Sequence, residues 1–476
     1  MCHKSAPPLK SPMPARTAAR YAMVLVLVWG GATGALLAQN GNATAPAAPA
    51  APAPQPPGGL QIGSISAYGV YYSSFSPVVT TSSTNLPSEV AAGGSIVFNW
   101  TKFTERSSFS LTYTPSYTGY LRNSSLNALN HSLSLTISRK IAPQWTFGFS
   151  AAGSLISVQQ SLFAPTTLSN VASASSTFND LAAGLLSANF ANNPQLGAIL
   201  NSSPLVQSPL NNLFYGQRMF TSSARVNLSY SYSPRLSVTF SGGGSRSQHV
   251  EDPALGAGNN AVIPNTTSGT ASVGISYSLS PLTQIGGTVA STRSSSLIYD
   301  GYTTTSLATL GRTLGGRWVA QLHGGIGFTN AVRQTSSLVP AVPAKPGPVA
   351  GGSLTYKTLS HTFLGSFDRA VSDSYGLGAA TNSSASAAWH WRHPGSSWGL
   401  DSTFTWQQLQ GSNALGNTSG WSMTAGLTRA IGAHIVLLTQ YSHLTYSGGL
   451  LAAAYHYSQD AVRVSIGWTP HPAALR

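Results

Sequence analysis

The sequence predicts an all-β fold, and three observations support this prediction. Apolar and polar residues alternate along nearly the whole chain after residue 60, as in "GTASVGISYSLSP" at 269–281, and a period of two is typical of a strand with two different faces. Charged residues make up only 7% of the chain, against about 25% in soluble proteins. Short and long connections alternate between the strands. Together they predict a transmembrane antiparallel up-and-down β-barrel of about 16–18 strands.

The N-terminal 38 residues are predicted to be a signal peptide. Four basic residues precede the apolar run "YAMVLVLVWGGATGALLA" at 21–38, which is the order of a secretory signal. An uncleaved anchor helix is the alternative, because the run is just long enough to span a bilayer. The Pro/Ala-rich segment 39–59 follows, and we expect it to be an extended, flexible linker.

The net charge and the cysteine content indicate which partners and cross-links to expect. Four of the 24 basic residues precede residue 39, which leaves 20 basic against 10 acidic side chains. This positive charge is spread along the strands instead of forming a patch, so we expect no nucleic-acid partner. The single cysteine, Cys2, lies in the predicted signal, so the mature chain is expected to form no disulfide.

The predicted barrel covers residues 60–470, with a short tail at 471–476. We expect strands of about ten residues, in an even number that places both ends of the barrel on one side of the membrane. Strong alternation marks 109–113, 133–137, 145–149, 224–232, 236–240, 398–406, 421–427 and 461–468. Tight connections are expected at 104–106, 141–144, 233–235, 280–282, 314–316, 393–397 and 431–433, and longer ones at 74–91, 159–217, 249–266, 334–352, 410–418 and 447–459.

Tryptophans gather within a few residues of the predicted short turns. An aromatic girdle at a membrane interface places such residues at strand ends, whereas a soluble β-sandwich buries them in mid-strand. The sequence therefore predicts a girdle made of Trp100, Trp145, Trp318, Trp389, Trp391, Trp398 and Trp468.

With these features, the chain resembles bacterial outer-membrane β-barrels of the porin-like class over roughly residues 60–468. The resemblance implies the outer membrane of a Gram-negative-type bacterium, contact with outer-membrane lipid, and insertion by machinery that reads the C-terminal strand. "VRVSIGW" has the alternation and the terminal aromatic Trp468, although "TPHPAALR" follows it and Arg463 stands where that insertion signal prefers glycine.

The insert 159–217 is the third outer loop by this count. Within it, Asp180 could cap a helix that carries Leu181, Leu185 and Leu186 on one stripe. In general porins a long third outer loop folds into the barrel and narrows the channel, and this insert is similar in position. It lacks the acidic cluster usual there. An outward lid or adhesive surface loop and a disordered segment are the alternatives.

Three arginines are candidates for lumen charge. Arg225 and Arg463 each lie between two apolar residues, and Arg333 shares parity with Gln321 and His323, so all three are expected to point inward. With few acids to pair them, the lumen would be mildly positive and favour anions. Alternatively, each arginine bonds loop carbonyls or carboxylates and serves only to fix the barrel interior.

Motifs that carry chemistry are weak in this chain. "GSSWG" at 395–399 matches a nucleophile elbow but joins two predicted strands, and "HYS" at 456–458 and His249 are faint rim candidates for hydrolysis. His390 and His393 lack a third metal ligand nearby. We therefore predict no catalytic residue, metal or cofactor, and no enzymatic activity.

The function that the sequence favours is passive permeation of small solutes, with a preference for anions and with residues 159–217 as the constriction. A barrel that displays loops for adhesion, envelope anchoring or polysaccharide export is the alternative. A rim-sited envelope hydrolase is a third hypothesis. The sequence indicates neither a particular solute nor an oligomeric state.

Overall fold

The structure is a computed structural model in which the chain divides into two units, Met1–Gln55 and Pro56–Arg476. All described residues belong to the second unit, so the predicted signal, nearly all of the linker and the tail lie outside them. The described residues are 59–73, 88–124, 127–157, 218–250, 265–296, 299–334, 346–373, 379–392, 395–411, 417–432, 434–450, 453–468 and 470. Among them, no helix is long and apolar enough to cross a membrane.

Eighteen antiparallel strands form one sheet, which confirms the predicted fold class and strand number. The strands are β1 Gly59–Tyr72, β2 Glu89–Thr104, β3 Ser107–Tyr120, β4 Ala128–Ala142, β5 Trp145–Ser157, β6 Arg218–Ser231, β7 Leu236–Val250, β8 Thr266–Ser280, β9 Thr283–Ser296, β10 Tyr299–Leu314, β11 Trp318–Gln334, β12 Pro346–Lys357, β13 His361–Asp373, β14 Ala379–Arg392, β15 Trp398–Gly411, β16 Asn417–Ile431, β17 Ile435–Leu450 and β18 Ala453–Trp468.

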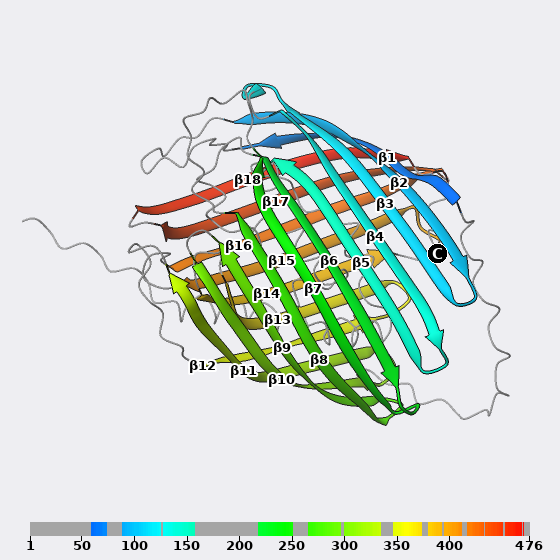
Figure 1. The fold of residues 1–476 in the computed structure, drawn as a ribbon. Coiled ribbons are helices and arrows are strands. Elements are labelled where there is room, and N and C mark those ends of the chain that lie inside the picture. The colour runs from blue at the N-terminus through cyan, green and yellow to red at the C-terminus, as the bar shows by residue number, and fades with distance from the viewer. Residues whose placement is uncertain are drawn as a thin grey trace, which may run out of the picture. The chain divides into compact units, whose positions relative to one another are not determined.

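The sheet closes on itself. Each strand pairs with its neighbours in sequence, and β1 also pairs with β18 from Ile65 opposite Trp468 to Tyr72 opposite Ala461. Figure 1 shows the resulting up-and-down barrel, with β1 beside β18. Closure satisfies the backbone of the first and last strands, which would otherwise be free edges.

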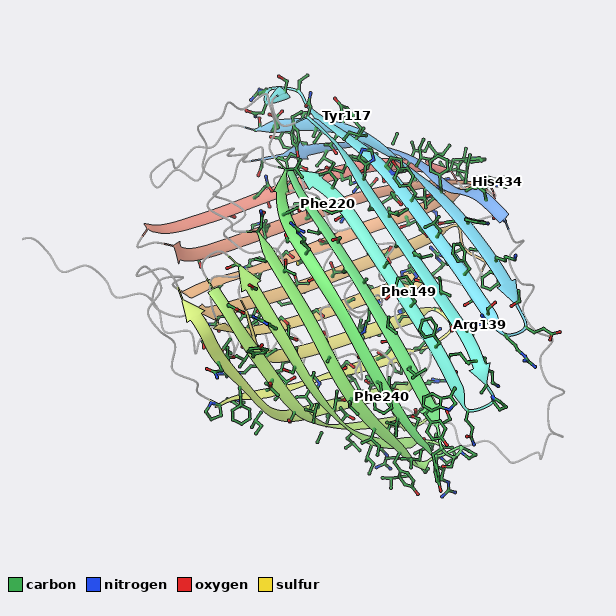
Figure 2. All side chains as sticks on the ribbon, in the orientation of Figure 1. Tyr117, Arg139, Phe149, Phe220, Phe240 and His434 are labelled. Carbon is green, nitrogen blue, oxygen red and sulfur yellow. The ribbon has the colours of Figure 1, made fainter. Side chains whose placement is uncertain are left out.

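The two faces of the strands differ sharply in chemistry. On β18, Val462, Val464 and Ile466 are 43–49% exposed, whereas Arg463 and Ser465 between them are 9% exposed. Strand β8 repeats the pattern, with Val273 and Ile275 outside and serines inside. The apolar side chains therefore point away from the barrel, and the polar ones line its interior. Figure 2 shows the side chains on the ribbon, among them the outward Phe240 of β7, which is 44% exposed.

The outward apolar band has the height of a membrane. On β18 it runs from Trp468 to Val462 and gives way to Asp460, and on β9 it runs from Ile285 to the exposed Arg293. Eight residues at a tilt of about 40° rise roughly 20 Å, close to the apolar band of about 25 Å in outer-membrane barrels. An even-stranded, single-chain barrel of this kind is the form of bacterial outer-membrane proteins. The chain is therefore a porin-like barrel of the outer membrane of a Gram-negative-type bacterium.

Aromatic rings line the end of the barrel that carries the short turns. Trp145 packs on Tyr230 with 4.6 Å between ring centroids, and Trp318 packs on Tyr356 at 4.4 Å. The seven tryptophans named from the sequence all occupy outward positions of their strands, as their register shows: Trp100, Trp145, Trp318, Trp389, Trp391, Trp398 and Trp468.

All seven predicted tight connections join consecutive strands at this end. An eighth turn, 358–360 between β12 and β13, was not predicted because its sequence holds no glycine, proline or charged residue. Its geometry rests on a side chain, since the Thr358 hydroxyl accepts a hydrogen bond of 2.9 Å from the His361 amide. By contrast, Gly315 and Gly316 have φ of 58° and 72°, the left-handed pair that a type I′ hairpin turn requires.

At the opposite end, the predicted bounds of two long loops are wrong. Residues 447–459 are almost entirely strand, because β17 continues to Leu450 and β18 begins at Ala453, and the predicted loop 334–352 contains the start of β12 at Pro346. The strands have 12 to 17 residues instead of about ten. Where a strand extends beyond the apolar band, both of its faces meet water, and the alternation that marks a strand in sequence disappears.

The long insert joins β5 to β6 and is the third connection at this end. Residues 158–217 lie outside the described part of the chain, including Asp180, Leu181, Leu185 and Leu186. The helix and the constriction that the sequence predicts there stay predictions.

The outward band can be tested by placing an arginine at two depths. Val464→Arg, midway between Trp468 and Asp460 on β18, is expected to cost about 2–4 kcal/mol of folding free energy in a bilayer, whereas Leu60→Arg at the level of the tryptophans costs about 0–1 kcal/mol. Reversible unfolding in lipid vesicles, followed by tryptophan fluorescence, measures both. Equal costs at the two positions would contradict the assignment of the band.

Candidate functional site

The interior wall is made largely of hydroxyl groups that bond to each other across neighbouring strands. Residues directly opposite each other in an antiparallel pair bring their side chains within contact, so a serine or threonine meets another on the next strand. A hydroxyl in such a pair keeps acceptor capacity for water. The pairs are Ser66–Ser95, Ser154–Thr221, Ser229–Thr239, Ser237–Ser276, Ser241–Ser272, Ser245–Ser268, Thr270–Thr292, Ser366–Ser386 and Thr405–Ser422.

Arg225 lies in a hollow of this wall. It donates hydrogen bonds to Asn227 Oδ1 at 3.1 Å and to Ser241 Oγ at 3.2 Å. The hollow has a volume of about 300 Å³ and is lined by small and hydroxyl-bearing side chains of β4 to β8. Gly243 stands opposite Arg225, where an added Cβ would come within 2.8 Å of the Ala224 carbonyl oxygen. The glycine therefore permits the close approach of β7 to the backbone of β6 at Arg225.

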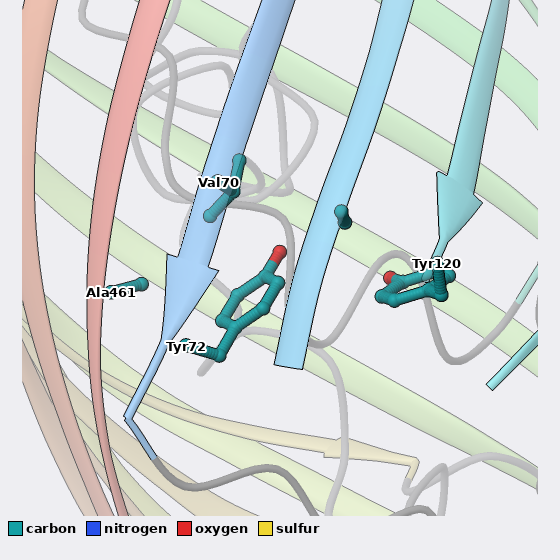
Figure 3. Packing of buried hydrophobic residues seen from close by; sticks show 5 residues of the cluster. Val70, Tyr72, Tyr120 and Ala461 are labelled. Carbon is teal, nitrogen blue, oxygen red and sulfur yellow. The ribbon is translucent and has the colours of Figure 1, made fainter. Parts of the chain in front are cut away.

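Arg463 is held more tightly, at the seam between β18 and β1. Its guanidinium carbon lies 4.2 Å from the centroid of the Tyr68 ring, a cation–π contact. Tyr68 in turn reaches over Gly93 of β2 and bonds the Thr118 hydroxyl of β3 at 2.5 Å. Figure 3 shows the adjoining buried cluster of Val70, Tyr72, Ala91, Tyr120 and Ala461.

The inward carboxylates already have partners. Asp368 bonds His323 at 2.9 Å, and Asp401 bonds His390 and accepts from the Thr428 hydroxyl at 3.3 Å. Glu89 accepts from the backbone N–H groups of Val90 and Arg122. Among the described residues, neither Arg225 nor Arg463 pairs with a carboxylate. Arg225 and Arg463 are therefore cations of the described wall that form no ion pair.

A bulge in β11 separates Arg333 from the inward-facing Gln321 and His323 of the same strand. Gly301 pairs with Ala331 and Asp300 pairs with Arg333, so one extra residue enters β11 between them. Such a bulge shifts the face on which the following residues lie, and the alternation from Gln321 and His323 is interrupted just before Arg333. The side chain of Arg333 itself is not among those described.

The weak sequence candidates for chemistry do not come together in the described residues. The side chains of His249 and His456 and the whole of His393 lie outside them. His390, for which the sequence offers no set of metal ligands, is bonded to Asp401. Ser397 lies in the connection between β14 and β15, not between a strand and a helix. No group of three metal-ligating side chains occurs in the part of the chain that the structure describes.

Three His–Asp pairs were missed in the sequence: His323–Asp368, His390–Asp401 and His443–Asp460. The partners are 45, 11 and 17 residues apart and meet only through strand register. His390 faces Asp401 directly on the next strand, whereas His323 reaches across a whole strand to β13. Neither the composition nor the alternation of apolar and polar residues predicts these contacts, because both are properties of the local sequence.

Comparisons with known proteins give weak results. No protein-family model and no curated protein matches the chain. Among solved structures, Pseudomonas aeruginosa OccK5 (OpdH) is 11% identical with a TM-score of 0.40, over 86% of this chain and 98% of its own. Acinetobacter baumannii OccAB4 is 9% identical with a TM-score of 0.41, over the same shares. The siderophore receptor PirA from Pseudomonas aeruginosa is 11% identical with a TM-score of 0.38, over 87% and 80%. Similarity at this level carries no argument about function.

The His323–Asp368 bond across Gly351 yields a stability prediction. A Cβ at position 351 would lie 2.4 Å from His323 Cε1 and 2.6 Å from the Phe367 carbonyl oxygen, so Gly351→Ala must displace the imidazole and should cost about 1–3 kcal/mol. Gly365→Ala is the control, since a Cβ there meets nothing within 4 Å. Urea unfolding in lipid vesicles compares the two variants. A loss no larger at 351 than at 365 would show that the imidazole moves aside freely.

Proposed function

We propose that this chain is a channel for the passive permeation of small polar solutes. The observation that carries the proposal is the closed barrel of 18 strands whose interior face is polar. Barrels of 16–18 strands are wide enough to leave an aqueous channel, unlike eight-stranded barrels, which side chains fill. A wall of hydroxyl groups supports the passage of hydrated solutes, because it offers hydrogen bonds without a strong fixed charge.

A preference for anions is the finer part of the proposal. Arg225 supports it most directly, because its guanidinium is bonded only to neutral groups among the described residues and borders the hollow of β4 to β8. Arg463 contributes less, since it is 9% exposed and stacked on Tyr68. An arginine that borders a low-dielectric pore without a paired carboxylate raises the local concentration of anions.

The third part of the proposal is that the third outer connection narrows the channel. Residues 159–217 join two strands of the same wall that holds Arg225, since β5 and β6 are neighbours. A connection of this length, placed at the outer end of the barrel, is long enough to enter the lumen, and long loops of this kind are normally functional. The support for narrowing is this length and position.

Planar-bilayer recording tests the channel and its constriction. The full chain is expected to give steady single-channel conductance, which rises when residues 159–217 are replaced by a short Gly/Ser linker, because a wider lumen conducts more ions. A barrel that opens only after the deletion would indicate a plug instead. Silence of both forms, with insertion verified by heat-dependent gel migration, would contradict a channel and favour a scaffold that displays loops.

Reversal potentials in a salt gradient test the two arginines. Arg225→Ser is expected to lower the anion-to-cation permeability ratio severalfold, and Arg463→Ser to lower it less, because the Arg463 guanidinium is buried against a ring. Arg139→Ser, on the outward parity of β4, is the control and should leave the ratio unchanged. Unchanged selectivity in both lumen variants would assign the arginines to bracing of the barrel wall.

A further inference from the structure

A compact polar cluster interrupts the outward face of the barrel at the top of the apolar band. It consists of Tyr441, His443 and Thr445 on β17, Asp460 on β18 and Ser73 just after β1. Alternate residues of one strand share a face, so the three members on β17 stand in a row. Asp460 lies directly opposite His443 in the register of β17 and β18. The pairing of β17 with β18 therefore builds most of the cluster, and closure of the barrel adds Ser73.

The cluster contains a continuous hydroxyl–imidazole–carboxylate line. His443 Nδ1 lies 2.7 Å from Asp460 Oδ1, and His443 Nε2 lies 3.0 Å from Thr445 Oγ1. The Tyr441 hydroxyl donates to the same Asp460 oxygen at 2.6 Å, and the Ser73 hydroxyl donates to Oδ2 at 3.4 Å. The imidazole is thus held at both of its nitrogens, by an acid on one side and an alcohol on the other.

This arrangement selects one tautomer of the imidazole. A carboxylate only accepts hydrogen bonds, so the proton of neutral His443 sits on Nδ1 and points at Asp460. Nε2 is then an acceptor, and the Thr445 hydroxyl donates to it. These are the roles of the general base and the nucleophile in a Ser–His–Asp triad, where the acid orients the base and the base takes the proton of the alcohol.

The other two His–Asp pairs lack this order. In the inward-facing pair of His390 and Asp401, the hydroxyl of Thr428 bonds the carboxylate, at Asp401 Oδ2, and so does not complete a line through the imidazole. His323 reaches Asp368 through Nε2 across a strand of the interior wall. Of the three His–Asp pairs, His443–Asp460 is the one that faces outward.

The depth of the cluster matches the ester groups of a lipid leaflet. Asp460 stands eight residues above Trp468 on β18, roughly 20 Å along the membrane normal at ordinary strand rise and tilt. The apolar residues Val462 and Val464 lie directly below it, and their side chains are 43% and 48% exposed. The His443 side chain is 23% exposed and the Asp460 side chain 44%. Trp421 packs beside the imidazole with 4.9 Å between ring centroids, as interfacial tryptophans do.

We propose that Thr445, His443 and Asp460 form a hydrolytic site for the acyl esters of membrane amphiphiles, on the outer surface of the barrel. The proposal goes beyond permeation and does not depend on it, since the site faces lipid and not the lumen. The substrate class follows from the surroundings: an apolar band to hold acyl chains below, and the polar triad at the level where a lipid carries its ester carbonyl.

The reaction follows from the geometry. Thr445 Oγ1 attacks the ester carbonyl carbon while its proton passes to His443 Nε2, and the imidazolium is stabilised by Asp460. The tetrahedral intermediate collapses, the carbon–oxygen bond to the leaving alcohol breaks, and the proton on Nε2 goes to that alkoxide. Water then attacks acyl-Thr445 with the same base, which releases a fatty acid and restores the hydroxyl. No oxidant, reductant or metal takes part.

Covalent labelling of the folded full-length barrel tests the nucleophile. In detergent micelles, a long-chain alkyl fluorophosphonate is expected to label Thr445, as peptide mass spectrometry would show. Thr445→Ala should abolish the label, and His443→Gln should slow labelling by about 10²-fold or more, because the general base is lost. Ser447→Ala is the matched control: it removes a hydroxyl of the same outward row on β17 and should leave labelling unchanged.

Turnover and fold are followed in the same preparations. Hydrolysis of a long-chain p-nitrophenyl ester should fall in Asp460→Asn as well, since an amide can hold the ring in the wrong tautomer, while heat-dependent gel migration shows that the variant is folded. Absence of label on the folded wild-type chain, label at another residue, or labelling indifferent to His443→Gln would each overturn the proposal. Conductance of the same variants is expected to be unaffected, so failure of the channel and failure of the site are separate results.

Discussion

The whole structure depends on the pairing of β1 with β18. Inside a bilayer an unpaired backbone N–H or C=O group costs several kcal/mol, so an open sheet of these strands would not be stable there. The eight register pairs from Ile65–Trp468 to Tyr72–Ala461 remove both edges at once. They also bring together residues from the two ends of the chain: Arg463 with Tyr68, and Asp460 with Ser73. The contact of Arg463 with Tyr68 exists because the sheet closes, and closure adds Ser73 to the polar cluster that β17 and β18 form.

Closure also places the two faces of each strand in different surroundings. Val464 meets lipid and Ser465 meets the interior, although they are adjacent in sequence. The chain consequently needs little charge, because neither the apolar band nor the hydroxyl wall uses it. Several charged groups of the described strands are held at particular places: Arg225 in its hollow, and the three His–Asp pairs, of which His443–Asp460 lies at the rim.

The sequence predicted the local parts of this structure and could not predict the parts made by register. Alternation placed Val464 and Ser465 on opposite faces, and seven turns were found from glycine, proline and charged residues. The turn at 358–360 escaped because a threonine side chain makes it, and the bulge before Arg333 escaped because an extra residue in one strand is visible only against its partner. His443 and Asp460 lie on either side of the predicted loop 447–459, and their contact depends on the register of β17 and β18, which alternation alone does not give.

Two glycines in the wall have a mechanical consequence. At Gly93 and Gly351 a side chain crosses an intervening strand, so Tyr68 of β1 holds Thr118 of β3, and His323 of β11 holds Asp368 of β13. Such second-neighbour ties act as cross-braces, which resist the hinging between adjacent strands that would flatten a cylinder into an ellipse. Between β4 and β8, the hydroxyl bonds among the described residues join only adjacent strands. This arc, which carries the Arg225 hollow, is therefore expected to deform more readily than the braced arcs β1–β3 and β11–β13.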